Sequence, residues 1–259
     1  MNHFRNSTLM AILALAVLVL AACGGGGDDS ASTPAPDAAS APPAAAGTAT
    51  ISGNVTVANA SDVDIDLKMD ADPVCAGLHA DGARSTTQMV GAGGELANAF
   101  VYVKSGLSGS FPAPAEPAVL SQVGCLYSPH VGGVQVGQML KVVNTDPTLH
   151  NVHASPTANP EFNQAQPFQG MELERTFDTT EVMIPFKCDV HPWMSSYLGV
   201  VDHPFFAVTA ADGSFSIDGL PAGSYTLEIW HEKLGTQTAD VTVEDGGTAS
   251  IDVGFEAGA

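Results

Sequence analysis

Basic residues are scarce in this chain. Eight Lys and Arg stand against 28 Asp and Glu among 259 residues, for a formal net charge of −20. A surface with this charge repels nucleic acid and anionic lipid headgroups, so we expect no nucleic-acid partner. It favours a partner protein with a basic surface. The alternative, that the acidity only keeps an exported protein soluble, stays open.

Long apolar runs are also missing. The longest, Leu9 to Leu20, covers about twelve residues, whereas a membrane-spanning helix needs roughly 20. It follows a short basic start and ends in Leu-Ala-Ala-Cys at Cys23, which resembles a bacterial lipoprotein signal. The resemblance implies a signal peptide over residues 1–23 and a lipidated Cys23. Because Gly24 carries no retention signal, it also implies an outer-membrane anchor facing the periplasm. An ordinary cleaved signal peptide, giving a soluble periplasmic protein, is the alternative.

Large apolar side chains are nearly absent from residues 24–48, which consist mainly of Gly, Asp, Ser, Ala and Pro. Such a segment cannot bury enough surface to offset the entropy of ordering. We expect it to be a flexible linker that lets an anchored domain reach its partners.

Cysteine is rare as well: the chain has four. Cys23 belongs to the signal, which leaves Cys75, Cys125 and Cys188. An odd number in an exported protein predicts one disulfide pair and one free thiol.

The most informative stretch is residues 186–194. Within seven residues it supplies a thiol, an imidazole and a thioether, from Cys188, His191 and Met194. These are the ligand types of a copper site in which Cys and His bind closely and Met weakly. The residues before it alternate, so every second side chain shares one face of a strand: Val182, Ile184, Phe186 and Cys188. Cys188 therefore ends a strand with its sulfur on the buried side.

A further ligand is expected from another strand. An alternating run from Val134 to Val143 leads to Asn144 and then to two histidines, His150 and His153. Positions three apart on a strand face opposite sides, so only one of the two histidines is expected to bind the metal.

Asn144 followed by His150-Asn151-Val152-His153, and later Cys188-x2-His191-x2-Met194, resembles the small type 1 blue copper proteins (cupredoxins) of the amicyanin and plastocyanin type. The resemblance covers residues 117–203. It implies a Greek-key β-sandwich, single-electron transfer with a cytochrome or dehydrogenase, and one copper ion with these ligands: His150, Cys188, His191 and Met194. The family commonly has Thr or Ser after the ligand Cys; Asp189 stands there instead, where it can still accept a hydrogen bond from Asn151.

With Cys188 implied as a copper ligand, Cys75 and Cys125 are left for the disulfide. A second, zinc-like site remains the alternative, with these ligands: Cys75, His79, Cys125 and His130. The chain shows no second copper cluster, nucleophile–base pair or phosphate loop, so we do not expect an enzyme. An enzyme with a further, catalytic copper site remains an alternative, because three histidines have no assigned role: His79, His130 and His153.

The remaining segments predict a second β-sandwich. After residue 204, Asp212-Gly213-x-Phe215 and Leu220-Pro221-Ala222-Gly223-x-Tyr225 resemble the carboxypeptidase-regulatory, transthyretin-like sandwich. Residues 49–116 and 204–259 would form its two parts, with the Cys75 segment as an insertion in the first. The fold class is therefore all-β: a cupredoxin-like sandwich combined with a transthyretin-like one. An electron carrier is the first interpretation. A copper-storage, adhesion or ligand-binding module with a structural metal is the alternative.

Overall fold

The chain is almost entirely β-structure, as predicted. The computed structural model describes residues 47–59, 66–87 and 89–256, which form nineteen strands and one six-residue helix. The export signal, Cys23 and nearly all of the linker lie outside these ranges. Within them, no helix has the length and hydrophobicity needed to cross a membrane.

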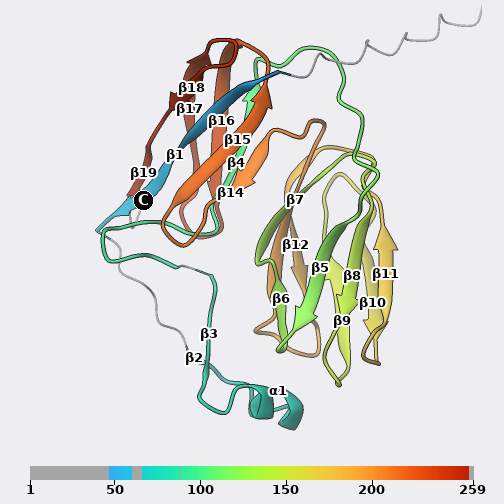
Figure 1. Cartoon of the computed structure of the whole chain (residues 1–259). Helices are drawn as coiled ribbons and strands as arrows, with labels where there is room; N and C mark the ends of the chain where they lie inside the picture. The colour runs from blue at the N-terminus through green and yellow to red at the C-terminus, as the bar shows by residue number, and fades with distance from the viewer. Residues whose placement is uncertain (1–46, 60–65, 88, 257–259) are drawn as a thin grey trace, which may run out of the picture. The chain divides into compact units, whose positions relative to one another are not determined.

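Nine strands between residues 118 and 201 form a two-sheet sandwich, here called sandwich I (Figure 1). The sheets have the strand orders β10-β9-β12-β13-β7 and β11-β8-β5-β6. Two pairs are parallel, β13 with β7 and β5 with β8, so consecutive strands cross between sheets in the Greek-key manner. The bounds are β5 Ala118–Val123, β6 Leu126–Ser128, β7 Val131–Gln135, β8 Leu140–Asn144, β9 His150–Ala154, β10 Phe162–Gln166, β11 Glu172–Arg175, β12 Glu181–Lys187 and β13 Ser195–Val201.

The buried face of β12 leads to the free cysteine. Ile184, Phe186 and Cys188 are all buried in the core of sandwich I, so the predicted period-two face is confirmed from Ile184 onward. Before it, Met183 has a φ of +68° and the pairing with β13 shifts register between Glu181 and Ile184. Met183 is buried too, but in a different apolar cluster, which contains Phe100 and Val131.

The alternating run from Val134 to Val143 is not one strand. It is divided between β7 and β8, with a turn at Gly137, where φ is +81°. The Gln138 N–H closes this turn on the Gln135 carbonyl at 2.9 Å. A left-handed glycine therefore reverses the chain inside an otherwise alternating pattern.

A second sandwich, sandwich II, is built from segments on both sides of sandwich I. Its sheets have the orders β15-β1-β18, with β19 also pairing β1, and β14-β4-β16-β17. Thus β1 and β4 precede sandwich I and the other six strands follow it. The bounds are β1 Ala49–Ala58, β4 Phe100–Ser105, β14 Phe206–Val208, β15 Ser214–Leu220, β16 Gly223–His231, β17 Gly235–Val243, β18 Thr248–Ser250 and β19 Val253–Glu256.

The Asp212-Gly213 turn of sandwich II requires its glycine. Gly213 has a φ of +75°, and a Cβ there would lie 2.6 Å from the Val55 carbonyl oxygen. The Gly213 carbonyl accepts a hydrogen bond from the Val55 N–H at 2.8 Å, which joins the turn to β1. The motif therefore fixes how the late strands meet the first strand of the chain.

The segment between β1 and β4, here called the α1 segment, contains β2 (Asp66–Leu67), α1 (Pro73–Leu78) and β3 (Ala83–Arg84). The predicted disulfide is present: Cys75 in α1 is bonded to Cys125 in the β5–β6 turn. The four residues of the alternative zinc-like site do not meet in this structure: the two cysteines bond each other, His79 bonds the Gly124 carbonyl at 2.6 Å, and His130 bonds Glu232.

Glu181 at the start of β12 supports the adjoining turn. Its carboxylate accepts hydrogen bonds from the N–H groups of Thr157, Ala158 and Asn159. Burial alone would raise the pKa of Glu181, but these bonds outweigh it and lower the pKa from 4.5 to about 2.

A group with a lowered pKa stabilises the fold above its unfolded-state pKa, and that contribution is lost as the pH falls through the folded value. We expect Glu181→Gln to lower the free energy of unfolding by about 1 kcal/mol at neutral pH. The difference from wild type should shrink between pH 4.5 and about 2. Urea unfolding at several pH values measures this. A difference that stays constant over that range would contradict the account.

Candidate metal centre

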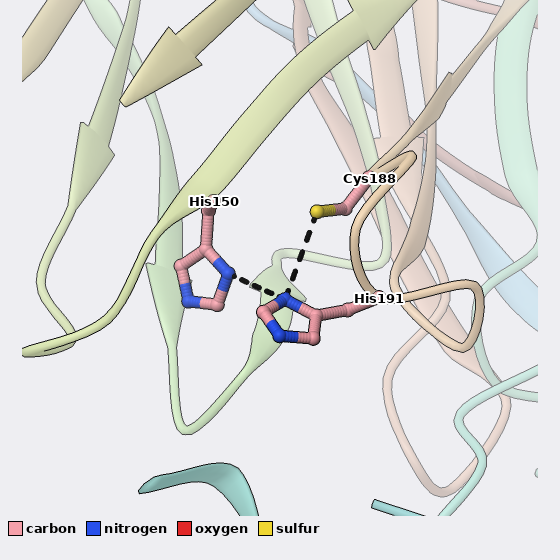
Figure 2. Close-up of side chains that lie close together, drawn as sticks. All are labelled: His150, Cys188 and His191. Atoms are coloured by element: carbon pink, nitrogen blue, oxygen red, sulfur yellow. Dashed lines mark hydrogen bonds between the residues drawn. The ribbon is translucent and has the colours of Figure 1, made fainter. Parts of the chain in front are cut away.

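Three buried side chains meet at one end of sandwich I (Figure 2). His150 begins β9, Cys188 follows the end of β12, and His191 lies on the loop after it. Their relative exposures are 0%, 1% and 2%. The Nδ1 atoms of the two imidazoles are 2.9 Å apart, and the Cys188 Sγ lies 3.7 Å from the His191 Nδ1. The structure thus brings together three of the four ligands that the sequence predicts.

Met194, the fourth predicted ligand, closes the same loop. Its carbonyl accepts the Cys188 N–H at 3.2 Å, and its own N–H donates to the His191 carbonyl at 2.9 Å. The side chain is fully buried in the apolar cluster that also contains Cys188. The loop therefore holds the thiol, the imidazole and the thioether in one compact turn.

Asn144 organises the approach to His150. Its side-chain amide donates to the Thr148 carbonyl at 2.9 Å and to the Gln166 carbonyl at 2.8 Å. Its Oδ1 accepts the N–H of Asp146 at 3.0 Å. These bonds shape the β8–β9 loop so that Asp146 lies beside the imidazole that follows it.

Each imidazole has a carboxylate on the nitrogen that faces away from the other ring. His150 Nε2 is 2.9 Å from Asp146, and His191 Nε2 is 3.2 Å from Asp72 of the α1 segment. Burial alone would raise the pKa of both carboxyls, but hydrogen bonds lower both pKa values below the ordinary one. Ionised carboxylates only accept, so each Nε2 carries the hydrogen. In a neutral ring the Nδ1 then presents its lone pair.

Two lone pairs at 2.9 Å repel unless a cation or a proton lies between them. Burial lowers the pKa of His150, but Asp146 and the thiolate of Cys188 outweigh it and raise the pKa to about 9. Burial also lowers the pKa of His191, and the hydrogen bond to Asp72 does not reverse this. In the metal-free protein, His150 therefore carries the shared proton, and a bound metal cation would replace it.

The groups around the sulfur of Cys188 favour its ionised form. Burial alone would raise the pKa of Cys188, but His150 and the backbone N–H groups around the sulfur lower it below the ordinary value. Those N–H groups belong to Asn151, Val190 and His191. A deprotonated thiol is the form that binds metal.

Asp189, which follows Cys188, makes the hydrogen bond with Asn151 that the sequence led us to expect. It accepts a hydrogen bond from the Asn151 side chain at 3.2 Å, and Asn151 Oδ1 in turn accepts the Asp189 N–H at 2.7 Å. The same Asn151 oxygen lies 3.2 Å from the Cys188 sulfur. Asn151 therefore links the residue after the cysteine to the sulfur itself.

This donor set suits copper. Two imidazole nitrogens and a thiolate, with a buried thioether nearby, are the ligand types that a type 1 copper site uses. The residues that would hold the ion are His150, Cys188, His191 and Met194.

The other histidines lie elsewhere. The imidazole of His153 bonds Asp189 and Glu161 at 2.9 and 2.8 Å, away from the pair of facing rings. Sequence reasoning missed Asp146 and Asp72. Asp146 had a local signal, since it stands four residues before His150. Asp72 had none, since it lies 119 positions before His191.

Comparison with known proteins gives one family match. Residues 201–256 match the model of the carboxypeptidase regulatory-like domain. This range contains β14 to β19, so the match supports the resemblance for the later part of sandwich II. No curated protein matches the chain.

Several solved structures are similar over part of the chain. A purple cupredoxin from Nitrosopumilus maritimus is 21% identical over 32% of this chain and 98% of its own, with a TM-score of 0.28. A Cu(I) methionine variant of amicyanin is 21% identical over 39% and 97%, with a TM-score of 0.30. A Cu-containing nitrite reductase from Thermus scotoductus is 22% identical over 38% of this chain but only 25% of its own, also with a TM-score of 0.30. The ligand set proposed here rests on the geometry above.

Replacement of Asp146 by Asn tests whether His150 carries the proton between the two imidazoles in the metal-free centre. We expect Asp146→Asn to lower the pKa of His150 from about 9, because the negative charge that stabilises the imidazolium is lost. An NMR titration of the imidazole nitrogens measures it. Asp178→Asn, which removes the same charge from an exposed site, is the control. A His150 titration that is unchanged in Asp146→Asn would contradict the account.

Proposed function

We propose that this chain binds one copper ion in a type 1 site and carries single electrons between redox partners. One observation supports this most directly: two imidazole Nδ1 atoms and a cysteine sulfur, all buried, lie close together, with each outer imidazole nitrogen held by a carboxylate. Such a donor set binds a soft or borderline cation, and copper is the one that also uses a nearby thioether.

Copper, when bound, supplies a one-electron couple. The residues of the chain keep the ligands in place in both oxidation states. His150 is fixed by Asp146, His191 by Asp72, and the Cys188 backbone by Met194. Ligands that do not move need little reorganisation when an electron arrives or leaves, which is what a carrier requires.

The buried Met194 and the apolar shell would set the reduction potential. Met194 lies among apolar neighbours that also surround Cys188, among them Phe186 and Trp193. A dry, apolar surrounding and a weak thioether ligand are established means of tuning such a site.

The setting of the carrier is part of the proposal. Cys23 would be lipidated, and the linker after it would tether the domain to the outer membrane on the periplasmic side. The net charge of −20 favours a redox partner with a basic docking surface, such as a cytochrome or a dehydrogenase. We propose a carrier without enzymatic activity of its own.

A visible absorption titration of the chain that follows Cys23 with Cu(II) tests the function. We expect an intense thiolate-to-copper band that saturates at one equivalent and is bleached reversibly by ascorbate. Cys188→Ser should abolish the band, since the sulfur supplies the charge transfer, while Cys75 and Cys125 remain in their disulfide. A wild-type protein that stays colourless, or that binds zinc in preference, would instead favour a structural or storage site.

A further inference from the structure

The α1 segment lies outside the strands of sandwich I but contacts its metal centre. Cys75 of α1 is fully buried and bonded to Cys125, whose segment belongs to sandwich I. The Cys75 sulfur lies 3.8 Å from the His191 Nε2. The disulfide therefore fixes the α1 segment against the outer edge of one predicted ligand.

Asp72 uses its two oxygens for different purposes. Oδ1 caps α1 by accepting the N–H groups of Val74 at 2.7 Å and Cys75 at 3.2 Å. Oδ2 accepts the Thr148 hydroxyl at 2.9 Å and faces the His191 Nε2 at 3.2 Å. A residue that only capped a helix would need one oxygen, so the second is available to orient the imidazole.

The rest of the His191 ring is enclosed as well. The Trp193 ring lies 5.0 Å from it, centroid to centroid, and its indole N–H donates to the Cys125 carbonyl at 3.0 Å. Asp72 is 18% exposed, whereas His191 is only 2% exposed. The imidazole edge that faces away from the metal position is thus covered by a carboxylate, a disulfide sulfur and an indole.

We propose that Asp72 is a positioning residue of the metal centre, supplied by the α1 segment and clamped there by the Cys75–Cys125 disulfide. It holds the hydrogen of His191 on Nε2, so that Nδ1 stays directed at the metal, and it closes this side of the site to solvent. This inference rests on the proposed copper site.

Asparagine at this position discriminates between the two roles of Asp72. It offers one acceptor oxygen where aspartate offers two, so it can satisfy the cap of α1 or the His191 N–H, but not both. If it keeps the cap, its NH2 group faces His191 and the Nε2–H of His191 loses its acceptor. Asp72→Ser is the second variant, since serine caps a helix well but is too short to hold the imidazole.

The first readout needs no metal. 1H–15N NMR of the metal-free protein reports the hydrogen bond of the His191 Nε2–H. We expect this N–H to show the downfield 1H shift and slow solvent exchange of a bond to a carboxylate in wild type, and to lose both in Asp72→Asn. Asp70→Asn is the matched control, because it removes the same charge from an exposed position of the same segment.

The second readout is the reduction potential of the copper-loaded protein. A carboxylate on the outer nitrogen favours Cu(II), and loss of such a partner typically weakens metal binding 10- to 100-fold. We expect Cu(II) affinity to fall at least 10-fold more than Cu(I) affinity in both Asp72 variants. Each tenfold change in the ratio of the two affinities raises the reduction potential by about 59 mV. A role in folding alone would lower the thermal stability and leave this ratio unchanged.

The outcomes separate the two proposals. Asp72 variants with the wild-type Nε2–H signal of His191 and the same potential as Asp70→Asn would overturn the role of Asp72 and leave the copper site standing. If the wild-type protein binds no copper but Asp72→Asn still loses the Nε2–H signal, the copper site is overturned and the orientation of His191 by Asp72 is supported.

Discussion

Two imidazole nitrogens that carry lone pairs face each other across 2.9 Å at one end of sandwich I. Buried lone pairs at this distance are unfavourable unless something positive lies between them. Asp146 and Asp72 enforce the arrangement by holding both ring hydrogens on the far side. A proton satisfies the pair in the metal-free protein, and the thiolate of Cys188 makes the position suitable for a larger, softer cation.

Several parts of the chain supply residues to this end of sandwich I. His150 and Cys188 come from the ends of adjacent strands, β9 and β12, within one sheet. Asp72 comes from the α1 segment, which precedes sandwich I in the chain and is fixed to it by a disulfide that spans 50 positions. Sandwich II is completed by strands from before and after sandwich I, so the two sandwiches are joined by two chain connections.

The sequence predicted the features that local pattern controls. The period-two face ending at Cys188, the short spacing to His191 and Met194, and the all-β class all follow from neighbouring residues. It did not predict the turn at Gly137, because a left-handed glycine does not disturb an alternating pattern. It also did not predict the burial of Met183, which lies in a cluster with Phe100 of β4. Nor did it predict Asp72 against His191, because that contact depends on a tertiary fold that brings distant segments together.

The central claim is that His150, Cys188 and His191 form a preformed set of metal ligands that changes little with oxidation state. X-ray absorption spectroscopy at the copper edge, on the oxidised and the reduced protein, tests this most directly. The account predicts one sulfur and two nitrogen scatterers in the inner shell of both forms. A shell of nitrogen and oxygen only, or the loss of a histidine on reduction, would contradict it.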